Sequence, residues 1–253
     1  MRQLIGFIKK DFLIEKHYRL HFITKIFGIL FQLTIFYFFS KLVSEDFFPF
    51  LFLGILFSKT FNFALSNLTE TIRQEQYWQT LEPLFLSGIK PLKLTILFFV
   101  SKFIFFLIEL LIFMIFGYMF FKINFGFTKF ILIIFILLIN LICFCGIGFF
   151  SAGFVMMFKR GDPVNWFLSN LVDLLSGVYF PVVILPDWLC NISYILPTTY
   201  GLKFLRDTVL NEPFESVNVY ILIFTGIIVA IFGYMFFRYT IYFCLKKGSL
   251  SHY

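Results

Sequence analysis

Long apolar segments are the feature that most restricts how this chain can fold. A helix that crosses a bilayer needs about 20 mostly apolar residues, and six segments meet this requirement. Backbone groups in lipid must find hydrogen-bond partners within their own segment, so we expect each segment to be an α-helix. The alternation of apolar and polar residues that is typical of barrel strands is absent. The expected spans are residues 20–43, 47–66, 92–121, 130–158, 164–185 and 217–242.

The overall composition agrees with a membrane-embedded chain. Of the 253 residues, 60% are hydrophobic and only 14% are charged, whereas a soluble domain is about half apolar and about a quarter charged. These fractions exclude a soluble globular domain, a disordered chain and a fibrous repeat. The 43 Phe residues have two explanations, a pocket for apolar substrates and a bias toward AT-rich codons, and we favour the second. The fold class that follows is an all-α polytopic membrane protein with six transmembrane helices.

The distribution of Lys and Arg predicts the orientation of the spans. Cytoplasmic loops of membrane proteins carry more basic residues than the loops on the other side. Fourteen Lys and Arg residues lie on the side of the two termini, and five lie on the opposite side. We therefore expect a multi-pass protein of the cytoplasmic (inner) membrane with both termini in the cytoplasm. Because this bias accounts for most of the net charge of +7, nucleic-acid binding need not be invoked.

The segment before the first span, residues 1–19, has a helical pattern of its own. Leu4, Ile5, Ile8 and Phe12 recur at helical spacing, and basic residues occupy other positions around the helix. This pattern predicts an amphipathic helix that lies in the cytoplasmic interface of the membrane. The alternative is a cytoplasmic extension of the first span.

The loop 67–91, between the second and third spans, is the most polar stretch of the interior sequence. We expect a short helix that begins near Thr69 or Thr71 and ends near Glu82, because Pro83 follows. Such a helix would dock in a groove of a cytoplasmic partner; the alternative is a helix at the lipid headgroups. The side chains that it would present are Arg73, Glu75, Tyr77, Trp78, Leu81 and Glu82.

The segment 174–206 is apolar but interrupted by helix-breaking residues. A new helix is expected after Pro186, where Asp187 and Trp188 follow, but the apolar run 188–196 is too short to cross a membrane. We therefore expect a short re-entrant or interfacial helix within an outer hairpin and loop over residues 186–216, with an ordinary outer loop as the alternative. The interrupting residues are Gly177, Pro181, Pro186 and Pro197.

The loop 67–91 and the segment 174–206 both resemble the ABC-2 type permeases, the membrane subunits of a class of ABC exporters. The loop resembles the family pattern of a Glu followed by Gly-Thr-hydrophobic-Glu, with Gln79 in place of the usual Gly; the matching residues are Glu75, Thr80, Leu81 and Glu82. The outer segment resembles the family's succession of a Gly-x-x-aromatic-Pro turn, a Leu-Pro-x-Trp-Leu element, a Pro-Thr element and a Leu-Arg pair. Its matching residues are Gly177, Pro181, Leu185, Pro186, Trp188, Leu189, Pro197, Thr198 and Arg206.

The resemblance implies one ABC-2 type transmembrane domain over residues 1–253, in which the loop 67–91 holds the coupling helix that contacts an ATPase subunit. It also implies a homodimer, or a pair with a similar permease, together with two ATPase copies in surrounding membrane lipid. ATP and Mg would bind the partner, because this chain has no GxxxxGK[ST] P-loop. It also has no HExxH motif, so metal-dependent hydrolysis within the membrane is poorly supported. We therefore expect a non-catalytic chain without cofactor or metal. Its substrate would be a drug- or lipid-like amphiphile that is moved outward.

Three ionisable residues, Lys59, Glu109 and Asp173, fall inside the expected spans. A charge at membrane depth is costly unless it is paired or hydrated, so each is a candidate functional group. Lys59 and Glu109 lie near the middle of antiparallel neighbours, where an ion pair would belong either to a translocation path or to the bundle's structure. Asp173 has no clear partner in the sequence, and Lys102 is expected to extend to the cytoplasmic surface. The alternative functions are an ion-coupled secondary transporter that uses these charges and a membrane-embedded lipid-modifying enzyme.

Overall fold

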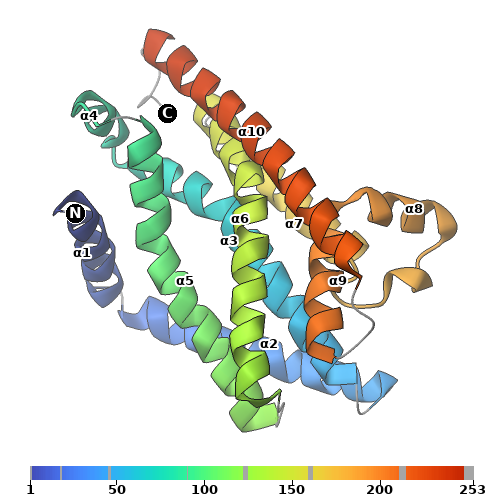
Figure 1. Cartoon of the computed structure of the whole chain (residues 1–253). Coiled ribbons are helices and arrows are strands. Elements are labelled where there is room, and N and C mark those ends of the chain that lie inside the picture. The colour runs from blue at the N-terminus through green and yellow to red at the C-terminus, as the bar shows by residue number, and fades with distance from the viewer. Residues whose placement is uncertain are drawn as a thin grey trace. The chain divides into compact units, whose positions relative to one another are not determined.

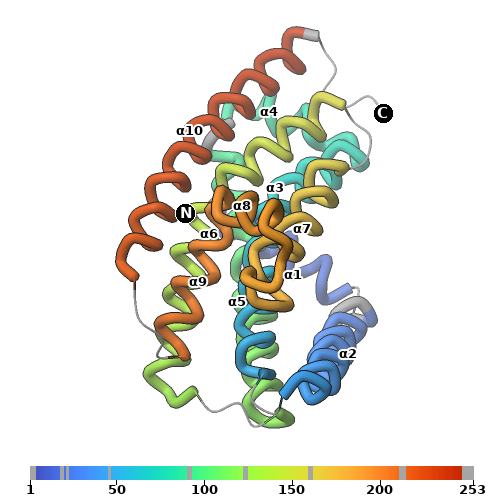
Figure 2. Tube along the Cα trace, turned by 90° about the vertical axis from the view of Figure 1, so that its right-hand side faces the viewer, coloured from blue at the N-terminus to red at the C-terminus, as the bar shows by residue number. Residues whose placement is uncertain are grey.

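The computed structural model describes residues 2–17, 19–44, 47–89, 91–121, 125–158, 162–210 and 215–247 (Figures 1 and 2). Every regular element in these ranges is helical, as the sequence predicted. The basic residues Lys90, Lys122, Lys159 and Arg160, which enter the orientation argument, lie outside the described residues, as do residues 211–214 of the outer loop. The elements are α1 (Arg2–His17), α2 (Arg19–Val43), α3 (Phe47–Tyr77), α4 (Leu81–Leu86), α5 (Pro91–Phe121), α6 (Gly126–Phe158), α7 (Pro163–Leu175), the 3₁₀ turn η1 (Val182–Ile184), α8 (Asp187–Ile195), α9 (Pro197–Leu210) and α10 (Ser216–Lys247).

Five helices of the described residues, α2, α3, α5, α6 and α10, are long and apolar enough to cross a membrane. They coincide with five of the six predicted spans. The remaining prediction, a continuous helix over 164–185, is wrong, because α7 ends after 13 residues and the chain turns at Gly177 with a φ of +80°. A helix of this length rises only about 20 Å, which is less than the hydrocarbon thickness of about 30 Å.

The chain divides into two compact units. Unit 1 contains residues Met1–Phe52 and Ile89–Asn124, with α1, α2, the start of α3 and α5. Unit 2 contains residues Leu53–Gly88 and Phe125–Tyr253, with the rest of α3 and the elements α4 and α6 to α10. The helix α3 is therefore continuous through both units, and each unit has its own packed core.

Unit 1 is packed largely through aromatic rings. Tyr37 of α2 lies 5.3 Å from the ring of Phe48 and 5.0 Å from the ring of Phe121. Phe52 packs on Phe113 of α5 at 5.2 Å between centroids. Such pairs add to the free energy gained by burying the rings, so part of the Phe excess forms core contacts.

Helix α1 packs along α5 in unit 1 (Figure 1). The ring of Phe7 on α1 packs edge-on against the ring of Phe98 on α5, with 5.4 Å between the centroids. Asp11, one turn after Phe7 on α1, is only 5% exposed. The predicted helix is confirmed, and Ile5 and Phe12 of its predicted apolar face are 60% and 56% exposed. An exposed apolar side suits the interfacial position, which stays a prediction.

Unit 2 is built around the pair α6 and α10, which run side by side (Figure 1). A Cβ added to Gly233 would lie 1.9 Å from the carbonyl oxygen of Gly146, and a Cβ on Gly146 would lie 2.5 Å from the backbone of Ala230. Small residues at these points let the two backbones approach closely, as is typical of membrane helices. On the α3 side of α6, Phe144 packs against the rings of Phe57 and Phe61 at 5.9 and 5.3 Å.

Candidate functional sites

The predicted coupling residues lie at the junction of α3 and α4, but the helix predicted from Thr69 or Thr71 to Glu82 is wrong. Both threonines lie inside α3, where their hydroxyls donate to the carbonyl oxygens of Leu65 and Asn67 instead of capping a helix start. Helix α3 continues to Tyr77, and α4 begins anew at Leu81. Pro83 falls in the first turn of α4, where its missing N–H is tolerated, so it does not end a helix.

A Schellman cap closes α3 and separates it from α4. The N–H of Thr80 donates to the carbonyl of Glu75 at 2.9 Å, and the N–H of Gln79 donates to the carbonyl of Gln76 at 3.0 Å. Gln79 has a φ of +57°, at the left-handed position where Gly is preferred. The one departure from the family pattern therefore falls on the residue whose backbone conformation favours glycine. The Thr80 hydroxyl also donates to the Glu75 carboxylate and stabilises the turn.

The cap separates the predicted coupling residues into buried and exposed groups. Glu75 and Leu81 are 3% and 0% exposed, whereas Tyr77 and Trp78 are 75% and 49% exposed. Arg73 and Gln74 join the two aromatic side chains around an open hollow of ≈ 350 Å³. The turn therefore holds Tyr77 and Trp78 on the surface, while the buried Glu75 and Leu81 keep its backbone in place.

The outer segment contains the short helix that the sequence predicted. Pro181 and Pro186 are extended and precede η1 and α8, respectively. Helix α8 begins at Asp187, and its Trp188 is 65% exposed. Pro197 begins α9, and α9 runs beside α6 in unit 2 (Figure 2). The location of α8 on the outer side stays a prediction.

Arg206 of α9 holds the turn that follows α7. Its guanidinium donates to the carbonyl oxygens of Gly177 at 2.7 Å and Val178 at 3.0 Å. A Cβ on Gly54 of α3 would lie 2.2 Å from the Val178 oxygen and 2.8 Å from the guanidinium, so a larger residue does not fit. We call Gly54, Gly177, Val178 and Arg206 the hairpin clasp. Arg206 is one of the five basic residues that the sequence places on the side opposite the termini, and it is only 8% exposed.

Side-chain hydroxyls tie α8 and α9 to the end of α7. Ser176 shares a hydrogen bond of 2.5 Å with Thr198, and both are buried. The Thr199 hydroxyl donates to the carbonyl of Ser193 at 2.6 Å. Hydrogen bonds between buried polar groups stiffen a structure, so the clasp and these bonds hold α7, α8 and α9 together.

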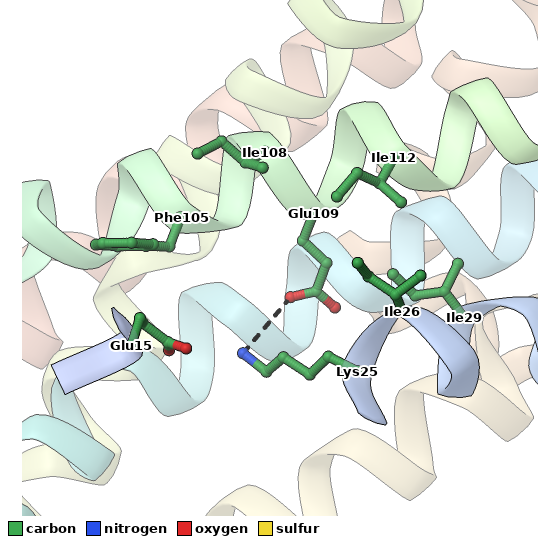
Figure 3. Close-up of a pocket in the computed structure, with 8 residues that line it drawn as sticks. All are labelled: Glu15, Lys25, Ile26, Ile29, Phe105, Ile108, Glu109 and Ile112. Carbon is green, nitrogen blue, oxygen red and sulfur yellow. Dashed lines mark ion pairs between the residues drawn. The ribbon is translucent and has the colours of Figure 1, made fainter. Parts of the chain in front are cut away.

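Two ion pairs lie against α5 among the described residues of unit 1. Lys25 of α2 lies 4.0 Å from Glu109 (Figure 3), and Lys102 lies 3.9 Å from Asp11 of α1. The prediction that Lys102 extends to the surface did not include this buried partner. The predicted pair of Lys59 with Glu109 would join the two units and stays a prediction.

A small cavity of ≈ 30 Å³ lies at the Lys25–Glu109 pair. In Figure 3, Glu15 of α1 points toward the Lys25 ammonium from the side opposite Glu109. One buried oxygen of Glu15 has no hydrogen-bond partner among the described residues. The cavity therefore brings two carboxylates and one ammonium together between apolar walls, which are formed by Ile26, Ile29, Phe105, Ile108 and Ile112.

Asp173 has partners that sequence reasoning missed. The hydroxyl of Ser58 on α3 donates to one carboxylate oxygen at 2.5 Å, and Tyr179 donates to the other at 3.3 Å. The Asn62 amide donates to the Ser58 oxygen at 3.3 Å. The sequence did contain a signal for this cluster. Ser58 and Asn62 are polar residues in an apolar span, and positions i and i+4 of a helix share a face.

One comparison with known proteins gives a match over most of the chain. The family model of the ABC-2 type transporter matches residues 2–210. This range includes α1 through α9, and so contains the Schellman cap, the hairpin clasp and the Asp173 cluster. The search among curated proteins finds no match.

Proposed function

Because the chain belongs to the ABC-2 type transporter family, we propose that it is the permease subunit of an ATP-driven exporter that works with a separate ATPase. The family's membrane component is not itself catalytic. ATP and Mg would therefore bind the partner. Family membership favours this function over the ion-coupled transporter and the lipid-modifying enzyme.

The α3–α4 turn is the observation that carries the proposal. It presents Tyr77 and Trp78 outward on a backbone fixed by the Glu75–Thr80 cap. Exposed aromatic residues on a rigid support are the usual energetic centres of protein interfaces. We propose that these two side chains, flanked by Arg73 and Glu82, dock in a groove of the ATPase on the cytoplasmic side.

The length of α3 suggests how the movement reaches the membrane. The helix has 31 residues without a break and is therefore about 46 Å long. It bears the docking turn at one end, and Ser58 and Gly54 farther along. When ATP closes the partner's nucleotide dimer, a shift of the turn would displace these residues together and move the span bundles between two arrangements.

The proposed assembly has two permease copies, as a homodimer or a pair with a similar permease, and two ATPase copies. The substrate would be an amphiphile that leaves the inner membrane outward. Differential contacts in the two arrangements must supply the coupling free energy. The exposed aromatic and aliphatic side chains of α8 suit contact with lipid at the outer interface.

Affinity purification of the full chain in mild detergent tests the proposal. An ABC ATPase should co-purify, and Trp78→Ala should reduce its recovery about tenfold or more. Trp188→Ala is the matched control, because it removes another exposed Trp away from the turn, and it should leave recovery unchanged. Recovery that survives Trp78→Ala and Glu82→Ala together would contradict the docking surface, and the absence of any ATPase would contradict the function.

A further inference from the structure

The hydrogen bonds around Asp173 all run toward its carboxylate. Ser58 and Tyr179 each donate to a different oxygen. The amide of Asn62 donates to the Ser58 oxygen, which leaves the single hydroxyl proton of Ser58 for Asp173. Burial raises the pKa of Asp173, whereas the hydrogen bonds from Ser58 and Tyr179 act against this shift and favour the ionised carboxylate.

Asp173 differs from two other acidic groups near the spans because it lacks a cation. Glu109 has Lys25 at 4.0 Å and Asp11 has Lys102 at 3.9 Å. In the part of the chain that the structure describes, no Lys or Arg nitrogen lies within 4.0 Å of the Asp173 carboxylate. A carboxylate has about four lone-pair positions, and two accept these bonds. The two unused lone-pair positions of Asp173 could accept bonds from a ligand, and a cationic ligand would balance the carboxylate charge.

The surface of α7 around Asp173 is accessible and carries both polar and apolar side chains, with Ser169 and the exposed Asn170 one turn before the carboxylate. Asp173 itself is half-buried, while Phe167 and Leu174 of the same helix are 57% and 50% exposed. Trp166 is 73% exposed and precedes Asp173 by two helical turns, about 10 Å along the same face. An aromatic or alkyl ligand body can lie against the exposed apolar side chains of α7 while its cationic head meets the carboxylate.

We propose that Asp173 binds the head group of a lipophilic amine or quaternary ammonium compound, so that the exported substrate is a cationic amphiphile. The inference rests on the proposed export function and names its substrate class. Ser58 and Tyr179 are positioning residues, because they hold the carboxylate in place.

Binding to the purified full chain in mild detergent tests this proposal. Two fluorescent probes share a dye and a dodecyl chain, and end in a trimethylammonium group or in a neutral hydroxyl. The wild type should bind the cationic probe about tenfold more tightly. Asp173→Asn should abolish this preference and Asp173→Glu should retain it. Glu215→Gln is the matched control, an acid-to-amide change at an exposed site, and should retain it too.

Equal binding of the two probes by the wild type, or a preference that survives Asp173→Asn, overturns the inference. If Asp173→Asn does not fold, Tyr179→Phe decides, because it removes one donor and keeps the charge. It should weaken binding of the cationic probe a few-fold and leave the neutral probe unaffected; unchanged or equally weakened binding of both overturns the inference.

The binding assay needs no ATPase, so the two proposals can fail separately. Selective binding through Asp173 in a chain that recruits no ATPase contradicts only the export function. ATP-dependent export of both probes with equal efficiency, once the co-purified ATPase is reconstituted with the chain, contradicts only the inference about the cation.

Discussion

Arg206 donates a hydrogen bond of 2.7 Å to the backbone carbonyl of Gly177, a residue 29 positions earlier in the chain. The bond places a buried cation on the turn that ends α7, and the same guanidinium reaches the next carbonyl. A hydrogen bond from a charged group is stronger than one from a neutral group. We therefore regard this contact as the main support of the hairpin clasp.

Replacing Arg206 by Gln should destabilise the chain by about 3 kcal/mol, because two buried carbonyls lose a charged donor. The measurement is the thermal unfolding midpoint of the purified protein in detergent. Lys203→Gln is the matched control on the same helix, since its partner Glu215 at 2.7 Å is also exposed and such pairs contribute little. Equal shifts for the two variants would contradict the role of the clasp.

Gly54→Ala should also destabilise the chain, because the added methyl group would overlap the Val178 oxygen and the Arg206 guanidinium. Overpacking of a buried contact costs about 1–3 kcal/mol. Gly28→Ala is the control, since Gly28 also lies in a long helix but has nothing within 4 Å of an added Cβ. Unfolding midpoints that fall equally in both variants would point to a general effect of replacing glycine.

Gln79→Gly should stabilise the α3–α4 turn by about 1 kcal/mol, because Gln79 has a φ of +57° and Gly carries no steric penalty there. The greater backbone freedom of Gly in the unfolded chain opposes part of this gain. The reverse change at a similar site, Gly88→Ala, should destabilise the chain, since Gly88 has a φ of +77° and open space around it. Unfolding midpoints that shift in the same direction in the two variants would contradict backbone strain as the cause.

Lys25→Met should destabilise unit 1 more than Glu109→Gln does. Without Lys25, the partly exposed carboxylates of Glu15 and Glu109 face the same small cavity with no cation between them, and two like charges close together repel each other. Without the Glu109 charge, Lys25 still has Glu15 nearby (Figure 3). The double variant Lys25→Met/Glu109→Gln should recover about 1 kcal/mol or more relative to Lys25→Met.

The two single variants and the double variant form a double-mutant cycle. The unfolding midpoints of all three are measured, and export is a second readout. Normal export by Glu109→Gln at normal membrane levels would agree with a structural pair. Lost export with an unchanged midpoint would instead assign Glu109 to the translocation path. Additive effects of the two single changes would contradict an interaction between these side chains.

The spanning helices could be predicted because their signal is local. A run of apolar residues must be helical in lipid whatever its neighbours are, so α2, α3, α5, α6 and α10 were within reach of sequence reasoning. The short helix at Asp187 was also predictable, since a Pro before an acidic first turn is a local start signal. The resemblance to the ABC-2 type permeases was also recognisable from the sequence, because it rests on short motifs in the loop 67–91 and the segment 174–206.

The helix boundaries at α4 and α7 were not predictable in this way. Helix α3 continued through Thr69 and Thr71 because their hydroxyls bond within the helix, and it ended at a left-handed Gln79 that no composition rule selects. At α7, the chain turned at Gly177 instead of continuing to residue 185, because Arg206 and the space left by Gly54 stabilise the turn.

The sequence by itself determined a helical membrane protein that resembles the ABC-2 type permeases, and the approximate positions of five helices long and apolar enough to cross a membrane. Only the tertiary structure decided which partners the charged side chains have. Arg206 proved to be a buried donor, Glu109 an ion-pair partner of Lys25, and Asp173 an acceptor for Ser58, which is 115 residues away. Apolar length is a property of a segment, whereas a buried polar group is stabilised only by partners that the fold brings to it.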